Sequence, residues 1–287
     1  MRRLRAAAVP SHTLAAELLL MHTLGRDRAW LYAHPEQPLQ AAELAAYFDL
    51  VERRIAGVPT QYLTGRQEFW GLELEVTPDV LIPRPETEHV VEVALERLGP
   101  PTWEEEAAGL PRGHGLRIAD VGTGSGCLAI ALACELPGAQ VFATDISAAA
   151  LAVARRNAGR HGVAGRIHLV QGNLLDALAG PPLRPLDLIV SNPPYVGRRE
   201  ADHLPLEVRA HEPPQALFGG ESGQELYAPL IAQAARLLRS GGILVMELGY
   251  NALLHVRPLL ETGQDWQQIR LTRDLAGIPR VLSAQRV

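Results

Sequence analysis

From Leu116 onward the chain alternates short apolar runs with helical patterns, and this alternation limits the folds open to it. The strand candidates are 116–121, 140–145, 167–171, 186–191 and 242–248, and helical patterns fill 126–136, 147–161 and 224–239. Strands joined through helices pair in parallel, because each connection crosses one face of the sheet. The sequence therefore predicts an α/β fold with a doubly wound, Rossmann-like parallel sheet.

The two ends of the chain depart from this pattern. Residues 266–272 and 280–286 are strand candidates without a long helix between them, so we expect an antiparallel terminal strand. Residues 11–57 have helical periodicity, and the alternation over 67–77 predicts a hairpin. A helix is expected over 86–98 and an exposed loop over 99–114. In the helical part, apolar residues recur at Leu14, Leu18 and Met21 and at Leu44, Phe48, Val51 and Ile55. We therefore expect a small N-terminal helical domain (1–66), a β-hairpin connector (67–80) and the sheet domain (81–287).

A glycine-rich turn follows the first strand candidate and reads Asp120-Val121-Gly122-Thr123-Gly124-Ser125-Gly126. Glycine permits positive φ and close approach to a ligand, and the next helix offers free N–H groups at its start. The glycines are spaced more tightly than in the dinucleotide fingerprint, without obvious room for a pyrophosphate. This favours a nucleoside cofactor without phosphate, such as S-adenosylmethionine (SAM), with Asp120 as a candidate partner for its ammonium group.

Two more strand ends carry residues that suit such a cofactor. Asp145 ends the next strand, where a carboxylate can accept both hydroxyls of a ribose. After the third strand, Asn173 is a candidate to bond the adenine edge and Leu174 to pack on its face. An ordinary strand-to-helix turn is the alternative, but the combination of the glycine turn with Asp145 counts against it.

The fourth strand candidate leads into Asn192-Pro193-Pro194-Tyr195. The side-chain carbonyl of Asn192 and the backbone carbonyl of Pro193 can accept both N–H groups of a primary amide and orient its nitrogen. The prolines stiffen the loop and remove N–H donors, and Tyr195 offers a flat face for a planar group. A proline-rich turn with a packed tyrosine is the alternative. Together with the glycine turn, this loop predicts methyl transfer from SAM to nitrogen.

Motifs before and after this core indicate which kind of nitrogen accepts the methyl group. Before the core stand the segments 59–65, 68–72 and 81–88, and after it come Glu212-Pro213 with Ala216-Leu217, then Gly219-Gly220, Gly223, Tyr227, 274–277 and Arg280-Val281. In order and spacing these motifs resemble the peptide chain release factor glutamine methyltransferase family, known as PrmC or HemK. The resemblance covers nearly the whole chain. It implies SAM as methyl donor and, as acceptor, the glutamine of the Gly-Gly-Gln motif in class I release factors.

The resemblance also implies residue roles. Gly122 to Gly126, Asp145, Leu174 and Asn192 would contact the cofactor, Asn192 through Tyr195 would bind the glutamine amide, and the N-terminal helices would help dock the release factor. For Arg84 and Glu86 we expect an ion pair that anchors the following helix, with a place in the substrate cleft as the alternative. Glu247, at the end of the fifth strand, is expected to be structural.

Composition limits the other functions. The net charge is −5 and aromatic residues make up 5%, which weighs against stable nucleic-acid binding. No run of eighteen apolar residues and no convincing signal peptide occurs, so we expect a cytoplasmic protein without a membrane span. The ten histidines are scattered, and we predict no metal site. Adenine-N6 methylation of nucleic acid, glutamine methylation of a ribosomal protein, and SAM binding without catalysis remain as alternatives.

Overall fold

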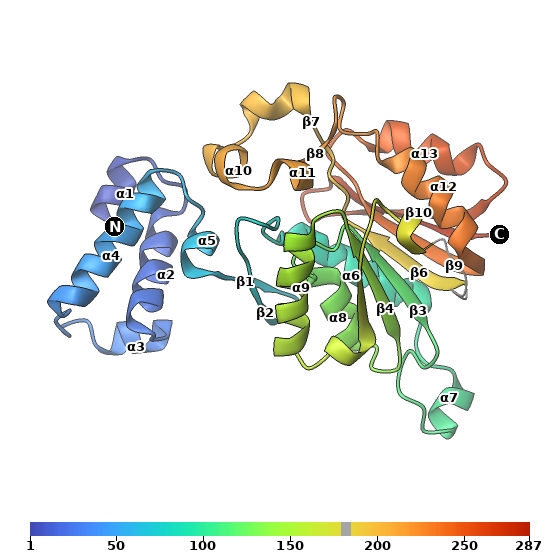
Figure 1. The fold of residues 1–287 in the computed structure, drawn as a ribbon, viewed down its shortest axis with the longest axis horizontal. Helices are drawn as coiled ribbons and strands as arrows, with labels where there is room; N and C mark the ends of the chain where they lie inside the picture. Colours follow the sequence, from blue (N-terminus) through green and yellow to red (C-terminus); the bar gives the residue numbers. More distant parts are fainter. Residues whose placement is uncertain (179–184) are drawn as a thin grey trace.

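The computed structural model describes residues 1–178 and 185–287. Its centre is a seven-stranded sheet with strand order β10-β11-β9-β6-β3-β4-β5 (Figure 1). The strands are β3 (Arg117–Val121), β4 (Gln140–Asp145), β5 (Ile167–Gln171), β6 (Leu186–Ser191), β9 (Leu238–Glu247), β10 (Trp266–Arg273) and β11 (Pro279–Arg286). The first five run parallel, and β11 pairs antiparallel with both β9 and β10. The predicted doubly wound sheet and its antiparallel end are thus confirmed.

Helices cover both faces of this sheet. One face carries α6 (Glu88–Leu98), α8 (Cys127–Glu135) and α9 (Ala148–Arg160), and the other carries α12 (Tyr227–Leu237) and α13 (Leu253–Glu261). Successive strand residues point to opposite faces, so Ile118 joins the first cluster and Ala119 the second. The central strands β3 and β6 are largely buried on both faces because helices cover both sides of the sheet.

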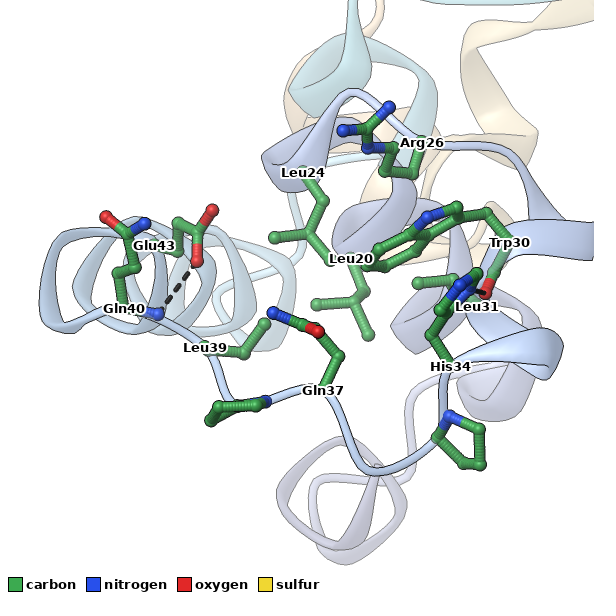
Figure 2. Close-up of a pocket in the computed structure, with 12 residues that line it drawn as sticks. Leu20, Leu24, Arg26, Trp30, Leu31, His34, Gln37, Leu39, Gln40 and Glu43 are labelled. Carbon is green, nitrogen blue, oxygen red and sulfur yellow. Dashed lines mark hydrogen bonds between the residues drawn. The ribbon is translucent and has the colours of Figure 1, made fainter.

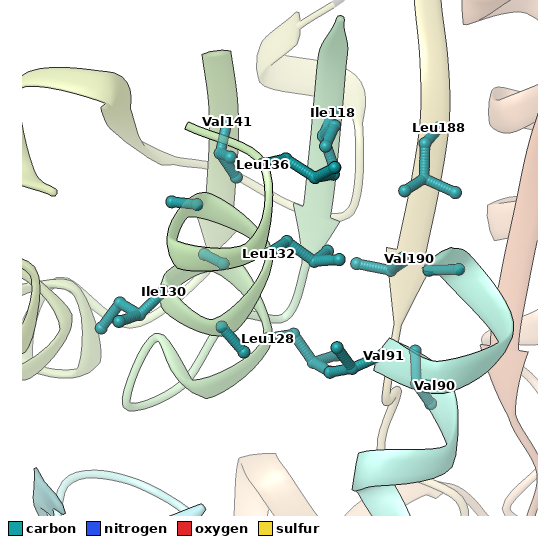
Figure 3. Close-up of a cluster of buried hydrophobic side chains, with 14 of the residues drawn as sticks. Val90, Val91, Ile118, Leu128, Ile130, Leu132, Leu136, Val141, Leu188 and Val190 are labelled. Carbon is teal, nitrogen blue, oxygen red and sulfur yellow. The ribbon is translucent and has the colours of Figure 1, made fainter. Parts of the chain in front are cut away.

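The core under α8 holds the glycine turn in place. Figure 3 shows Leu128 and Leu132 of α8 and Leu136, which directly follows the helix, along one side, facing the sheet and α6. These leucines follow a four-residue spacing, which keeps them on one helical face. Each is at most 2% exposed, and burying one such side chain contributes about 1.5–3 kcal/mol. Their packing therefore fixes the start of α8, directly after Gly126.

The N-terminal helices have a core of their own. They are α1 (Arg2–Ala6), α2 (His12–Leu24), α3 (Arg28–Ala33), α4 (Ala41–Ile55) and α5 (Thr60–Thr64), and they lie to one side of the sheet (Figure 1, blue). The buried residues of this core are Leu4, Val9, Ala15, Ala16, Leu19, Val51 and Leu63. The periodic residues Leu14, Leu44 and Phe48 are instead exposed, at 45%, 43% and 39%. Of the periodic residues, Val51 is buried in this core and Ile55 packs against it, so helical spacing identified the helices but only part of their buried faces.

The hairpin joins the two parts of the chain. It consists of β1 (Arg66–Phe69) and β2 (Leu72–Glu75), as predicted, and its turn residues Trp70 and Gly71 both have positive φ. On α9, the amide of Asn157 donates to the carbonyls of Glu75 and Ser125 and accepts from the N–H of Glu75. One buried side chain therefore ties the hairpin to the glycine turn. The domain limits 1–66, 67–80 and 81–287 stay a prediction.

The expected loop over 99–114 contains a short helix. It is α7 (Trp103–Ala107), and it begins with a capping box in which Thr102 and Glu105 bond each other's backbone N–H. Acidic residues in a first helical turn are favoured by the helix dipole, so the run 104–106 forms a helix where we expected a loop. In the part of the chain that is described, no helix is long and apolar enough to span a bilayer.

The segment between β6 and α12 runs from the sheet toward the N-terminal helices and back. We call residues 198–217 the bridging segment; it contains η4 (Arg198–His203), α10 (Leu206–His211) and α11 (Pro214–Leu217). On either side of it lie the short parallel strands β7 (Val196–Gly197) and β8 (Phe218–Gly220). The remaining short helices are η1 (Pro85–Thr87), η2 (Ala164–Arg166) and η3 (Asp176–Leu178).

Candidate active site

The glycine turn and the proline loop meet at the point where strand order reverses. Strands β3 and β6 are neighbours, and β4 and β5 continue from β3 in the other direction. Open α/β sheets bind ligands at such a switch point. The hydroxyl of Ser191 donates to the carbonyl of Val121 at 2.8 Å, and a Cβ on Gly122 would lie 4.0 Å from the carbonyl oxygen of Asn192. Residues seventy positions apart are thus adjacent at the sheet edge.

Each glycine of the turn has a backbone conformation that favours glycine. Gly122, Gly124 and Gly126 have φ of +73°, +54° and +86°. A Cβ on Gly126 would also lie 3.0 Å from Ile130 Cδ1 and 3.2 Å from Ala154 Cβ. The side chains of Thr123 and Ser125 are buried below the turn, at 3% and 2% exposure. The predicted turn therefore forms, with its backbone toward the open side.

Asp120 lies behind this turn. It is 1% exposed, and its Oδ2 accepts from Thr123 Oγ1 at 2.6 Å and from the Ala129 N–H at 3.1 Å. Among the described residues, its other oxygen, Oδ1, is buried without a hydrogen-bond partner. Burial raises the pKa of Asp120 to about 7, although the bond from Thr123 opposes the shift. The carboxyl group therefore has one buried oxygen with unused capacity for a donor.

A cavity of about 340 Å³ opens beside the turn, and we call it the glycine-loop cavity. Seven of the predicted site residues line it: Gly122, Gly124, Asp145, Asn173, Leu174, Asn192 and Pro194. Asp120, Thr123, Ser125, Gly126, Pro193 and Tyr195 are not part of its wall. Its remaining lining, which sequence reasoning missed, is Asp79, Val80, Leu81, Ile146, Ser147, Ala150, Gly172, Arg198, Gln215, Ala216, Phe218 and Leu226.

Asp145 faces this cavity with a carboxylate that is held in place. Its Oδ2 accepts from the Gly124 N–H and its Oδ1 from the Ser147 N–H, both at 2.9 Å. Each oxygen keeps further acceptor capacity for a ligand hydroxyl. Across the cavity wall, Leu174 adopts φ of +51°, an uncommon conformation for leucine. Strain of this kind concentrates at binding sites.

A second cavity, of about 200 Å³, adjoins the first, and we call it the proline-loop cavity. All four residues of the Asn192–Tyr195 loop line it, together with Leu81, Arg84, Val196, Leu204, Val208, Ala216 and Leu217. The two cavities share Leu81, Asn192, Pro194 and Ala216. A group in one cavity can therefore meet a group in the other beside Asn192.

Hydrogen bonds to neighbouring side chains hold both Asn192 and Tyr195 in place. Asn192 Nδ2 donates to Thr87 Oγ1 at 3.0 Å, and no donor among the described residues bonds Oδ1, which can therefore accept from a ligand. Tyr195 Oη donates to Glu247 Oε1 at 3.1 Å, and the ring packs on Gly249. Burial raises the pKa of the Tyr195 hydroxyl well above its usual value, so it stays protonated.

The expected ion pair between Arg84 and Glu86 is wrong. Arg84 pairs with Glu212 instead, and Glu212, 3% exposed, also accepts from the Ile82 N–H at 3.4 Å. Burial raises the pKa of Glu212, while the Arg84 guanidinium opposes that shift. Arg84 also lines the proline-loop cavity. The partner lies 128 residues away in sequence, so local spacing gave no signal for it.

A third cavity lies elsewhere, in the N-terminal helices. It measures about 420 Å³, and Figure 2 shows its walls of Leu20, Leu24, Leu31 and Leu39 with Trp30, His34, Gln37 and Glu43. The rings of Trp30 and His34 stack at 4.6 Å. None of the predicted site residues reaches it. We place the site at the sheet, because the strand ends, the glycine turn and the anchored amide converge there.

The fold and this site define a class of protein. A sheet with an antiparallel β11, a glycine turn after β3 and Asn-Pro-Pro-Tyr after β6 is the arrangement of a SAM-dependent methyltransferase. Residues 1–65 match the family model "PrmC N-terminal domain" and residues 107–208 match "Methyltransferase small domain". The catalytic domain of hMettl16 has a similar fold, with a TM-score of 0.56 at 18% identity, covering 79% of this chain and 80% of that one.

Two relatives settle the family. The release factor glutamine methyltransferase of Koribacter versatilis (strain Ellin345) is 43% identical over 286 residues, covering 100% of this chain and 95% of the relative. That of Chlorobaculum tepidum is 45% identical over 275 residues, covering 94% and 89%. The chain belongs to the release factor glutamine methyltransferase family.

Proposed function

We propose that this protein transfers the methyl group of SAM to the side-chain amide nitrogen (N5) of the glutamine in the Gly-Gly-Gln motif of class I release factors. The observation that carries this proposal is the meeting of two cavities beside Asn192, whose amide nitrogen is already held by Thr87. The amide oxygen is therefore available as an acceptor at the junction. Membership of the family supports the choice of glutamine and of release factors.

The glycine-loop cavity fits SAM. The residues of 122–126 would hold its amino-acid part through the backbone, and Asp145 would accept the ribose hydroxyls. Asn173 would bond the adenine edge while Leu174 packs against its face. Asp120 Oδ1, which has no partner among the described residues, matches the need of an ammonium group for a buried acceptor behind the turn. When bound, SAM supplies an electrophilic methyl group.

The proline loop would prepare the acceptor nitrogen. Asn192 Oδ1 and the carbonyl of Pro193 accept its two N–H groups, so the nitrogen lone pair is aimed at the junction of the cavities. As the new N–C bond forms, the bond between the methyl carbon and the sulfonium sulfur of SAM would break, and S-adenosyl-L-homocysteine would leave. Positive charge would develop on the nitrogen, and both acceptors would stabilise it. The surplus proton then leaves to water. Pro194 keeps the loop rigid, and Tyr195 offers its ring to the flat carboxamide.

The last part of the proposal concerns the binding partners of the protein and its location in the cell. The helices of 1–66 would dock the release factor, since they carry none of the proposed catalytic residues. No stable binding to nucleic acid and no membrane partner is part of the proposal, and a cytoplasmic location follows from a translation factor as substrate.

A labelling experiment tests this function. Incubated with methyl-labelled SAM, the protein should modify a class I release factor, and peptide mass mapping should place the label on the Gly-Gly-Gln glutamine. The same factor with that glutamine changed to alanine should remain unlabelled. Equal labelling of both factors would refute the proposal. Faster labelling of an adenine-containing oligonucleotide or of ribosomal proteins would favour those acceptors instead.

A further inference from the structure

A buried carboxylate beside the site has no role in the mechanism above. Glu247 ends β9 and is 1% exposed. Its Oε2 accepts from Thr87 Oγ1 at 2.6 Å and its Oε1 from Tyr195 Oη at 3.1 Å. Its backbone carbonyl separately accepts from Tyr227 Oη at 3.1 Å. Because Tyr227 holds the backbone, the carboxylate is not needed to anchor the end of the strand.

Thr87 joins this carboxylate to Asn192. Thr87 is 1% exposed and occupies the position before α6, where a threonine hydroxyl commonly caps the helix. Here the hydroxyl makes no capping bond within the described residues. It donates to Glu247 Oε2 and accepts from Asn192 Nδ2 instead. The hydroxyl therefore connects the two side chains and does not stabilise the helix end.

The donor and acceptor groups of Glu247, Thr87 and Asn192 determine the direction of each hydrogen bond between them. An ionised carboxylate can only accept hydrogen bonds, so the single proton of Thr87 must point toward Glu247. The oxygen of Thr87 then offers a lone pair to Asn192, which can satisfy it only with its NH2 group. The carbonyl of Asn192 must consequently face the cavities. A flipped amide would present two donors to a substrate nitrogen that also carries hydrogens.

The charges and hydrogen bonds around Glu247 agree with this polarity. Arg280 favours the ionised form of Glu247, and the hydrogen bonds from Thr87 and Tyr195 do so as well. Burial, together with Glu86, raises the pKa of Glu247 to about 6, which leaves the group ionised at neutral pH. The same carboxylate also fixes the Tyr195 hydroxyl, so both side chains that would meet the substrate amide are held by one group.

We propose that Glu247 and Thr87 are positioning residues: through the Thr87 hydroxyl, Glu247 sets the orientation of the Asn192 amide so that its oxygen, and not its nitrogen, meets the acceptor. This inference deepens the proposed function and rests on it. The competing explanation is that the three side chains merely satisfy one another in a buried place. The two explanations differ in what happens when the Thr87 hydroxyl is removed and then restored.

The test compares Thr87→Val, which removes the hydroxyl at nearly constant volume, with Thr87→Ser, which retains it. Turnover on the release factor should fall about 10- to 100-fold in Thr87→Val, as expected when a buried donor loses its acceptor. The dissociation constant for SAM should change by less than about threefold, since the contact does not involve the cofactor site. Thr87→Ser should recover most of the turnover. Ser283→Ala, the loss of another buried hydroxyl in β11, serves as the control and should leave turnover unchanged.

A second readout does not depend on activity. The side-chain NH2 signals of Asn192, identified by their loss in Asn192→Ala, should be protected from solvent exchange in the wild type and in Thr87→Ser. They should lose protection in Thr87→Val. If valine prevents folding, Thr87→Ala carries the same expectations. Wild-type turnover in Thr87→Val, or a loss that serine does not restore, overturns the inference. Absence of labelling by the wild type itself would instead count against the proposed function.

Discussion

At the scale of single residues, the site uses side chains that donate and accept in a fixed direction. Asn192 is suited to its place because one amide group carries both an acceptor for the substrate and a donor for Thr87. Aspartate would supply the acceptor but could not donate to Thr87 when ionised. The sequence pointed to Asn192 through its neighbours Pro193 to Tyr195. Thr87 lies in the motif 81–88 that carries the family resemblance, but the sequence gave no signal for its bond to Asn192, which lies 105 residues away.

The first prediction concerns the oxygen of Asn192. Asn192→Ala should lower turnover on the release factor by roughly 10²–10³, the loss typical of one preorganised acceptor in a transition state. SAM affinity should change only modestly, because the glycine turn and Asp145 remain. Single-turnover rates and SAM titration measure the two effects, with the exposed Asn251→Ala as a control. Near-normal turnover in Asn192→Ala would refute the role of this oxygen as an acceptor.

The second prediction follows from the raised pKa of Asp120, about 7, which burial causes. Only the ionised carboxylate attracts an ammonium group, so binding of SAM should favour loss of the proton. As the pH falls below about 7, the affinity for SAM should therefore weaken, approaching tenfold per pH unit. Calorimetric titration between acidic and mildly alkaline pH would measure it. Asp120→Asn should bind more weakly and with a flat profile; a wild-type profile as flat as the variant's would exclude the ammonium contact.

At the scale of elements, features set by local interactions could be predicted from the sequence, whereas features set by contacts between distant residues could not. Strands β3 to β6 and the glycine turn were predictable, because apolar runs and glycine spacing are local signals. Strand β9 begins at Leu238, before the predicted 242, because pairing of Leu238 with Leu186 extends it through polar and glycine residues. The buried face of α2 was not predictable, since it depends on how α4 and α5 pack against it. The Arg84–Glu212 ion pair was not predictable either, because only the fold brings these two residues together.

The third prediction separates two glycines of the turn. Gly126→Ala should lower the free energy of unfolding by about 2–4 kcal/mol, because positive φ and contacts at 3.0 Å and 3.2 Å add together. Gly124→Ala should cost about 1–2 kcal/mol, for φ alone, since no described atom lies within 4 Å of its added Cβ. Gly124 lines the glycine-loop cavity, so its variant should weaken SAM binding more than Gly126→Ala does. Urea unfolding and SAM titration measure both; the reverse ranking of SAM affinities would contradict the proposed place of the cofactor.

At the scale of the whole molecule, the bridging segment connects the N-terminal helices to both cavities. Arg54 of α4, 5% exposed, forms an ion pair with Glu207 of α10. A Cβ on Gly57 would lie 3.1 Å from Leu206, so the two parts pack closely there. Further along, Val208 and Leu217 line the proline-loop cavity, and Gln215 lines the glycine-loop cavity. The helices proposed to dock the release factor are therefore packed against the same segment that lines the cavity proposed for its glutamine.

The fourth prediction tests whether this connection matters for the substrate. Arg54→Ala removes the pair with Glu207 and a 3.2 Å bond to the Val58 carbonyl, and should cost about 1–3 kcal/mol of stability. It should also lower kcat/KM for the intact release factor by about 3- to 10-fold, because small errors in placing a substrate reduce the rate. A short Gly-Gly-Gln peptide reaches only the proline-loop cavity, so its kcat/KM should not change.

The matched control is Arg53→Ala on the same helix, whose pair with Asp49 spans 3.9 Å between exposed side chains and contributes little. Arg53→Ala should leave both substrates unaffected. A double-mutant cycle of Arg54→Ala with Glu207→Gln should then show that the two substitutions are not additive, since each removes the same contact. Equal losses on peptide and intact factor in Arg54→Ala would mean that the ion pair shapes the cavity itself. In that case the pair would have no part in aligning the docked factor with the site.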